Sequence, residues 1–255
     1  MNVRALIAEA LGTFTLVGLG SLSIAGLASV AAYQGLPPLL TVPFGFGLAL
    51  MAGMAMFGHV SGAHFNPAVT LAAWIDRRMD WMSAIGYVAA QIIGALTASL
   101  LILVLISKAA VVATLNQPAA AAASDPTGFA VSDLNAFIIE MILTTVFVAV
   151  ILTITNKAPQ LAVLVIPLTL VLIHFVGIPL TGASVNPVRS LAPAIVSGNY
   201  AHLWIYLTAP FAGSILGWLI YRFVSLPEDD ISVEVDVDDE EFEDLEDDDE
   251  ELAAG

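Results

Sequence analysis

Six long apolar segments constrain this chain more than any other feature of its sequence. The hydrocarbon layer of a bilayer is roughly 30 Å thick, and a helix needs about 20 mostly apolar residues to cross it. Six segments meet this requirement: Ala5–Ala32, Leu39–Phe57, Met82–Ser107, Leu134–Thr155, Leu161–Ile178 and Leu203–Val224. They predict an all-α protein that crosses a membrane six times.

Composition and charge divide the chain into a membrane domain and a tail. Hydrophobic residues make up 58% of the chain and charged residues 12%, which is more apolar surface than one soluble core buries. Of the 23 acidic residues, 17 lie between Glu228 and Glu251, so the part before them is nearly neutral. We expect a membrane domain over residues 1–226 and a disordered, acidic cytoplasmic tail over residues 227–255.

The basic residues predict the orientation, because loops rich in Lys and Arg stay in the cytoplasm. An even number of spans puts both termini on one side. If that side is the cytoplasm, Lys108 alone is external, Arg189 lies in a short apolar segment, and the other basic residues are cytoplasmic. These others are Arg4, Arg77, Arg78, Lys157 and Arg222. The longest external connection, Ala109–Val131, is expected to be a surface loop without catalytic content.

Two further apolar segments are too short to cross the membrane, and they resemble each other. They run from His59 to Ile75 and from Pro179 to Val196. Gly, Ala, Asn and Pro recur in register between Gly62-Ala63-His64-Phe65-Asn66-Pro67 and Gly182-Ala183-Ser184-Val185-Asn186-Pro187. Each half of the chain has three spans, so residues of about 1–110 and 130–226 form an inverted repeat. Interrupted segments at matching positions of an inverted repeat mark a permeation or binding site near the membrane mid-plane.

Each Asn-Pro pair predicts the start of a short helix. Asn is a preferred N-cap, and Pro is tolerated at the first helical position. The helices expected from Pro67 to Ile75 and from Pro187 to Ile195 would be roughly 13 Å long, about half the hydrocarbon thickness. Two half-helices from opposite faces would meet at the centre with their electropositive ends. A single Asn-Pro is more often only a turn, but two matching copies favour the half-helices.

At these residues the sequence resembles the aquaporin, or major intrinsic protein, family. The likeness covers about residues 4–224, and its two signatures are Ser61-Gly62-Ala63-His64-Phe65-Asn66-Pro67-Ala68-Val69-Thr70 and Asn186-Pro187-Val188-Arg189-Ser190. The resemblance implies six spans, two re-entrant half-helices and a passive channel for water that rejects ions and protons. It also implies that Asn66, Pro67, Ala68, Asn186, Pro187 and Val188 form the pore motifs.

The resemblance further implies a selectivity filter of four residues, which are Phe46, His174, Ala183 and Arg189. Glycerol facilitators of the family usually have glycine in place of the His and an Asp after the Arg, whereas Ser190 follows here. The alternative for His174 is a polar residue satisfied between packed helices. The alternative for Arg189 is a side chain that reaches the lipid headgroups. An Arg in a bilayer segment usually faces a water-filled cavity, which favours the filter.

Two acidic residues inside the spans are expected to support the pore rather than to contact water. The resemblance implies that Glu9 and Glu140 accept hydrogen bonds from the backbones of the two re-entrant loops. The alternative for each is a carboxylate that reaches the surface.

Three residues depart from the water-channel pattern of the family. Val188 replaces the usual alanine, Ala183 stands where many microbial water channels have threonine, and Leu207 stands where an aromatic residue is common. These departures keep a facilitator of small neutral solutes, such as glycerol or ammonia, as the alternative function.

Other function classes fit the sequence less well. An intramembrane enzyme would need a cluster of His or paired carboxylates in the spans. A secondary transporter would usually need an ion or proton site, and a membrane scaffold would not need Arg189. Without cysteine, disulfides and cysteine-ligated metals are excluded, and we expect no enzyme activity, cofactor, metal or nucleic-acid partner. The resemblance implies a homotetramer in the lipid of the plasma membrane.

Overall fold

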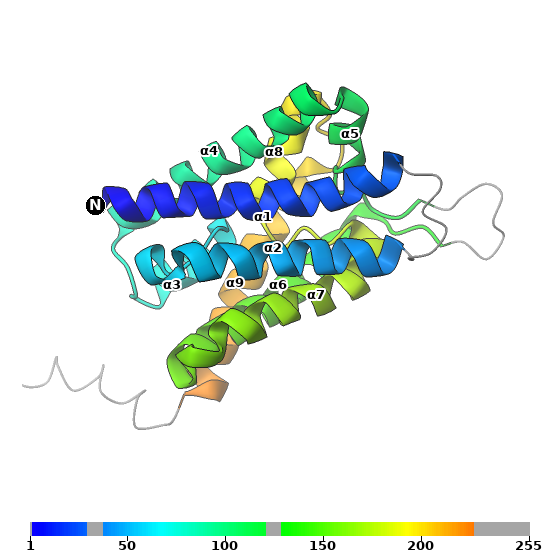
Figure 1. Cartoon of the computed structure of the whole chain (residues 1–255). Helices are drawn as coiled ribbons and strands as arrows, with labels where there is room; N and C mark the ends of the chain where they lie inside the picture. Colours follow the sequence, from blue (N-terminus) through cyan, green and yellow to red (C-terminus); the bar gives the residue numbers. More distant parts are fainter. Residues whose placement is uncertain (1, 30–37, 121–128, 227–255) are drawn as a thin grey trace, which may run out of the picture. The chain divides into compact units, whose positions relative to one another are not determined.

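The computed structural model describes residues 2–29, 38–120 and 129–226 of the 255. Within these residues the secondary structure is helical (Figure 1). The chain divides into one compact unit over Met1–Trp218 and a second over Leu219–Gly255. The described part of the second unit is the end of a long helix and a short π-helix, η2 (Tyr221–Ser225). The predicted tail, 227–255, lies outside the described residues.

Six helices are long and apolar enough to cross a membrane, as the sequence predicts. They are α1 (Val3–Ser29), α2 (Pro38–Ser61), α4 (Trp81–Leu105), α6 (Asp133–Lys157), α7 (Ala162–Thr181) and α9 (Leu203–Ile220). The largest differences from the predicted boundaries are four residues: α2 continues beyond Phe57 to Ser61, and α9 ends at Ile220 rather than Val224. The predicted end of the first span, Ala32, lies outside the described residues.

The two predicted half-helices are present and begin at their prolines. They are α3 (Pro67–Ile75) and α8 (Pro187–Ser197). Helix α8 continues beyond the expected Ile195 to Ser197, and Gly198, its C-cap with a left-handed backbone (φ 76°), closes the last turn. A short 3-10 helix, η1 (Pro159–Leu161), joins α6 to α7.

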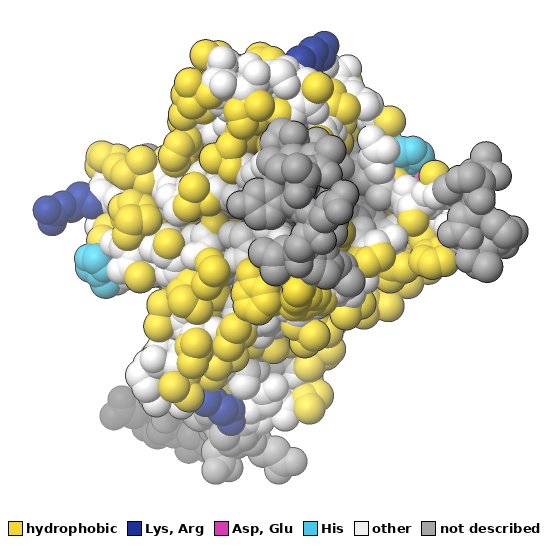
Figure 2. All heavy atoms as spheres, turned by 45° about the vertical axis from the view of Figure 1, so that its right-hand side comes forward, with side chains coloured by type: hydrophobic (Ala, Val, Ile, Leu, Met, Phe, Trp, Pro, Cys, Tyr) yellow, Lys and Arg dark blue, Asp and Glu magenta, His cyan; other side chains and the backbone are white. Residues whose placement is uncertain are grey.

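The outer faces of the spans are those of a protein in lipid. Hydrophobic side chains cover much of the face seen in Figure 2. Large apolar residues on the spans remain strongly exposed, for example Val104 at 75% and Ile93 at 61%. A soluble protein seldom exposes so much contiguous apolar surface.

Small residues allow the spans to pack closely against one another. Helix α1 lies between α2 and α4 (Figure 1). A Cβ atom added at Gly94 of α4 would overlap the backbone carbonyl of Ala10 in α1. The same relation recurs in the second half, where Gly213 of α9 adjoins the Met141 carbonyl of α6. Such close approach drives helix association in membranes.

The connection after α4 corrects the expectation of a surface loop over Ala109–Val131. Its first part forms a short helix, α5 (Lys108–Ala113), capped by Ser107. Val111, Thr114 and Asn116 are 1–5% exposed. An Ala-rich segment has no pattern that distinguishes a buried connection from an exposed one, so the prediction of a surface loop is wrong for this part.

The start of α4 is capped by Asp80, which accepts hydrogen bonds from the hydroxyl and the backbone N–H of Ser83. These bonds lower the pKa of Asp80 below its ordinary value, and the bond from the Ser83 hydroxyl has the largest effect. Because the pKa of Asp80 is lowered in the folded state, its bonds to Ser83 contribute their full stability above the pKa of the unfolded chain. This contribution is lost as the pH falls through the pKa of the folded state.

The close packing of Gly94 predicts a strong effect of a single methyl group. Gly94→Ala should destabilise the detergent-solubilised protein by about 1–3 kcal/mol, because backbone atoms of α1 cannot move aside without separating the helices. Gly26→Ala is the matched control, since a Cβ there meets nothing within 4 Å. Thermal stability followed by size-exclusion chromatography measures both. Equal melting temperatures for the two variants would contradict this packing.

Candidate functional site

The two loops that precede the half-helices have matching unusual backbones. Each contains three residues with positive φ, a region that residues other than Gly seldom adopt. The residues are Gly62 (84°), Ala63 (56°) and Phe65 (50°) in the first loop, and Gly182 (82°), Ala183 (48°) and Val185 (46°) in the second. A bulky side chain in this region costs roughly 1–3 kcal/mol, so other contacts must hold each loop.

Glu9 of α1 holds the first loop. Its side chain is completely buried. One carboxylate oxygen accepts from the Ser61 hydroxyl (2.7 Å) and the His64 N–H (2.9 Å). The other accepts from the Phe65 N–H (2.8 Å) and from Gln91 Nε2 (2.7 Å). Glu9 thus has four donors, two of which are backbone groups of the loop.

Glu140 of α6 holds the second loop in the same way and is also completely buried. It accepts from the Thr181 hydroxyl (2.6 Å), from the Ser184 N–H (2.9 Å) and from the Val185 N–H (2.9 Å). Two tyrosines complete the symmetry. Tyr87 donates to the Ser61 carbonyl (2.9 Å), and Tyr206 donates to the Thr181 carbonyl (2.8 Å).

The two asparagines meet, as the half-helix hypothesis requires. Asn66 Nδ2 donates to the carbonyl of Val185 (2.7 Å), and Asn186 Nδ2 donates to the carbonyl of Phe65 (2.9 Å). Each asparagine also caps its own helix. Asn66 Oδ1 accepts from the Ala68 N–H (2.9 Å), and Asn186 Oδ1 accepts from the Val188 N–H (3.2 Å). Since an amide NH2 group has two hydrogens, each asparagine retains a second N–H beyond its bond across the junction.

Both asparagines line a cavity of about 700 Å³. The cavity also includes His174 of α7, Phe46 of α2 and Arg189 of α8. The Phe46 and His174 rings are stacked with their centroids 4.6 Å apart, and Arg189 Cζ lies 4.9 Å from the centroid of Phe46. Three of the four residues predicted as the filter are therefore together at the cavity wall.

Ala183, the fourth predicted filter residue, lies differently. It is completely buried, and its methyl group points to Gly177 of α7, where an added Cβ would come within 2.9 Å of it. It does not belong to the residues that line the 700 Å³ cavity.

Two residues that line the cavity each have a buried polar atom without a partner in the described part of the chain. His174 Nδ1 is 2.9 Å from the Leu170 carbonyl. His174 Nε2 and Arg189 Nε are buried and have no hydrogen-bond partner among the described residues. Buried polar atoms are rarely left unpaired, so both side chains retain hydrogen-bonding capacity that the described protein atoms do not use.

Asn116, which the sequence analysis assigned to a surface loop, holds Arg189 in place. Its Oδ1 accepts from Arg189 NH1 and from the Ser190 hydroxyl (2.7 Å). Its Nδ2 donates to the carbonyl of Gly182 (2.8 Å). The Thr114 carbonyl also accepts from Arg189 NH1 (2.9 Å). One asparagine thereby joins the connection after α5 to both the second loop and the guanidinium.

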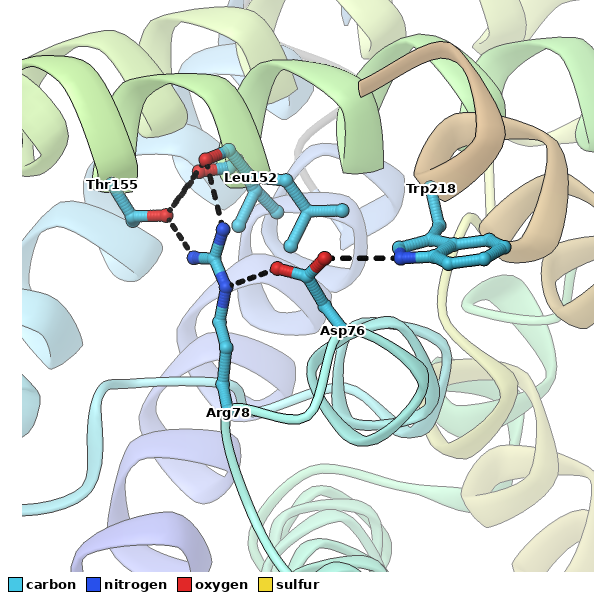
Figure 3. A network of polar contacts seen from close by, with 6 residues as sticks. Asp76, Arg78, Leu152, Thr155 and Trp218 are labelled. Atoms are coloured by element: carbon cyan, nitrogen blue, oxygen red, sulfur yellow. Dashed lines mark hydrogen bonds and ion pairs between the residues drawn. The ribbon is translucent and has the colours of Figure 1, made fainter. Parts of the chain in front are cut away.

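A second arginine, Arg78, lines the cavity on the side of the α3–α4 turn. Figure 3 shows its guanidinium between Asp76 and the residues Leu152 and Thr155 of α6. It donates to Asp76 (2.6 Å), to the Thr155 hydroxyl (2.7 Å) and to the Leu152 carbonyl (3.2 Å). The other oxygen of Asp76 accepts from Trp218 Nε1 (3.0 Å), so the turn is fixed to α6 and α9.

Comparison with known proteins agrees with this geometry. The family model described as "Major intrinsic protein" matches residues 1–221. The chain belongs to the major intrinsic protein family. The predicted resemblance is confirmed, and the six apolar helices form a multi-pass membrane protein of a channel family. The compact unit Met1–Trp218, which contains both half-helices, lies within the matched residues.

Individual relatives include both water and glycerol channels by name. The chain is 41% identical over 220 residues to the "Glycerol uptake facilitator protein-like 6" of Lactiplantibacillus plantarum, covering 84% of this chain and 94% of that protein. It is 36% identical to Aquaporin Z of Rhodopseudomonas palustris, covering 88% and 95%. The X-ray structure of the aquaglyceroporin from Plasmodium falciparum matches with a TM-score of 0.74 and 26% identity, covering 87% and 96%.

The contacts of Asn116 predict that the connection after α5 contributes to stability. Asn116→Ala removes its bonds to Arg189, Ser190 and Gly182. The free energy of unfolding should fall by about 1–3 kcal/mol for each buried group left unsatisfied. Asn135→Ala, on an exposed position, is the control with the same chemical change. The thermal stability of both variants in detergent provides the measurement. A loss of thermal stability for Asn116→Ala no larger than for Asn135→Ala would refute the stabilising role of the Asn116 contacts.

Proposed function

We propose that this chain is a passive water channel that rejects ions and protons. The observation that carries the proposal is the cluster of Phe46, His174 and Arg189 beside the junction of Asn66 and Asn186, all on one cavity. Phe46 supplies an apolar wall, and His174 narrows the passage. Arg189 supplies fixed donors and a permanent positive charge.

In the proposed mechanism the asparagine junction blocks protons. The N-terminus of each half-helix has roughly half a positive charge, so α3 and α8 together disfavour a cation between Asn66 and Asn186. A water molecule there accepts from the free N–H of each amide and must donate its own hydrogens elsewhere. The chain of hydrogen bonds that would conduct a proton is therefore interrupted at this point.

The remaining pore residues have supporting roles in this proposal. Pro67 and Pro187 start the half-helices without an unpaired N–H. Ala68 and Val188 donate their N–H groups to the caps, which leaves the asparagine NH2 groups directed away from the helices. Glu9 and Glu140 keep both loops folded, and we assign Ala183 a backbone role in the filter because its methyl group packs against Gly177.

A facilitator of small neutral solutes, glycerol above all, is the second candidate. It is favoured by the names of two relatives and by Leu207, where water channels of the family tend to have an aromatic residue. The Phe46 ring lies within 5 Å of both the His174 ring and the Arg189 guanidinium carbon, and this crowding favours water over a three-carbon polyol. We further propose a homotetramer in the plasma membrane with both termini in the cytoplasm and without a cofactor.

Permeability in proteoliposomes tests the choice between the two functions. We expect rapid shrinkage after an osmotic step, glycerol uptake close to that of empty liposomes, and no proton leak. Stopped-flow light scattering and a pH-sensitive dye inside the vesicles measure these rates. Water permeability equal to that of empty liposomes would defeat the channel proposal, and fast glycerol uptake would favour the facilitator.

Substitution of Arg189 tests the filter. Arg189→Val should raise cation permeability about tenfold or more, because like charges ~4 Å apart repel by ~4 kcal/mol at an effective dielectric constant of ~20. Arg4→Val removes an exposed positive charge and serves as the control. Vesicle depolarisation measures the cation flux. Unchanged cation exclusion in Arg189→Val would remove Arg189 from its proposed role.

A further inference from the structure

His64 in the first loop lines the cavity, although the sequence analysis assigned it no role. It is half-buried, and the edge of its ring that contains Nε2 lies beside Gly62, another lining residue. The corresponding residue of the second loop, Ser184, also lines the cavity but is only 2% exposed, and its hydroxyl lies 2.6 Å from that of Ser190. An imidazole at the wall is therefore a property of the first loop only.

The hydrogen bonds around Thr70 determine which nitrogen of His64 carries the proton. The Thr70 hydroxyl is 3.1 Å from the Asn66 carbonyl, which only accepts, so the hydroxyl hydrogen is directed there. His64 Nδ1 lies 3.1 Å from the same hydroxyl oxygen. With its hydrogen used, the hydroxyl accepts from Nδ1–H. The neutral ring then has a bare Nε2.

Gln91 on α4 secures this arrangement. Its Nε2 donates to Glu9 (2.7 Å) and to the Thr70 hydroxyl (2.9 Å), which uses both hydrogens of the amide. The reverse orientation would direct Oε1 at the carboxylate of Glu9. In the observed orientation Oε1 has no partner among the described residues, but the acceptor-only carboxylate of Glu9 is bound by an amide hydrogen. Because Gln91 donates to Thr70, the hydroxyl cannot direct its own hydrogen toward Gln91.

The same reasoning applies to His174 on the other side of the asparagine junction. Its Nδ1 lies 2.9 Å from the Leu170 carbonyl, so Nδ1 must be the protonated nitrogen and Nε2 an acceptor. This Nε2 has no partner among the described residues, and His174 is one of the residues that line the cavity. The two imidazoles come from different elements, one from a loop and one from α7.

We propose that Thr70 and Gln91 are positioning residues that hold His64 in the Nδ1–H tautomer, so that its Nε2 is a hydrogen-bond acceptor in the cavity. The asparagine donors then have an imidazole acceptor on each side. A small neutral molecule with at least two hydrogens on oxygen or nitrogen can accept from the amides and donate to either ring. The transport consequence rests on the proposed channel function, whereas the tautomer does not.

The tautomer is tested directly by 15N nuclear magnetic resonance of histidine-labelled protein in liposomes. The chain has four histidines, and His64→Gln identifies the His64 signals by their loss. We expect a protonated Nδ1 and an unprotonated Nε2 for His64 in the unsubstituted protein. A protonated Nε2 with a bare Nδ1 would overturn the proposal without any variant.

Thr70→Val and Thr70→Ser test the positioning role. Valine removes the hydroxyl that accepts from Nδ1, so the His64 signals should become a mixture of both tautomers. Serine keeps the hydroxyl and should restore the Nδ1–H signal. A His64 spectrum in Thr70→Val identical to that of the unsubstituted protein would refute the role of Thr70.

Transport separates this inference from the proposed function. Water permeability of Thr70→Val should fall roughly threefold to tenfold relative to Thr70→Ser, as expected for one ordinary hydrogen bond. Equal permeabilities would overturn the transport consequence of the acceptor. Absence of water conduction in the unsubstituted protein, with His64 in the Nδ1–H form, would defeat the water channel and still support the positioning of His64.

Discussion

Two buried carboxylates make the centre of this membrane protein possible. Glu9 and Glu140 each bind two consecutive loop N–H groups, at 2.8–2.9 Å, and no water is needed for these bonds. Without them the loops would present unpaired N–H groups inside a bilayer, each at a cost of several kcal/mol. With them the strained backbones at Phe65 and Val185 are tolerated, and the asparagines that follow are held in register.

The part of the fold that could be predicted is the part that local chemistry determines. Long apolar runs predict spans, and Asn66-Pro67 and Asn186-Pro187 predict helix starts, because an N-cap depends on residues two or three positions away. Asn116 and Gln91 escaped prediction because their partners, Arg189 and Glu9, are 73 and 82 residues away in the sequence. Nothing near either residue distinguishes it from an ordinary polar residue.

The residues that support the two loops recur in both halves of the inverted repeat and form a symmetric frame, whereas other polar residues near the loops differ between the halves. Glu9, Tyr87 and Gly94 in the first half have the counterparts Glu140, Tyr206 and Gly213 in the second. The polar groups that reach the cavity do not repeat in this way. At the cavity wall His64 corresponds to Ser184; behind the first loop Gln91, which does not line the cavity, corresponds to Pro210, which cannot donate. The frame therefore fixes where the two loops meet, while each side of the cavity has its own chemistry.

The crossed bonds from Asn66 to Val185 and from Asn186 to Phe65 have a consequence for biogenesis. The acceptor of Asn66 lies 119 residues further along the chain. When the ribosome has made only the first three spans, that acceptor does not yet exist, and the Asn66 amide must stay hydrated or bind elsewhere. The first loop therefore reaches its mature state only after the second loop enters the bilayer, so neither half of the chain completes its folding alone.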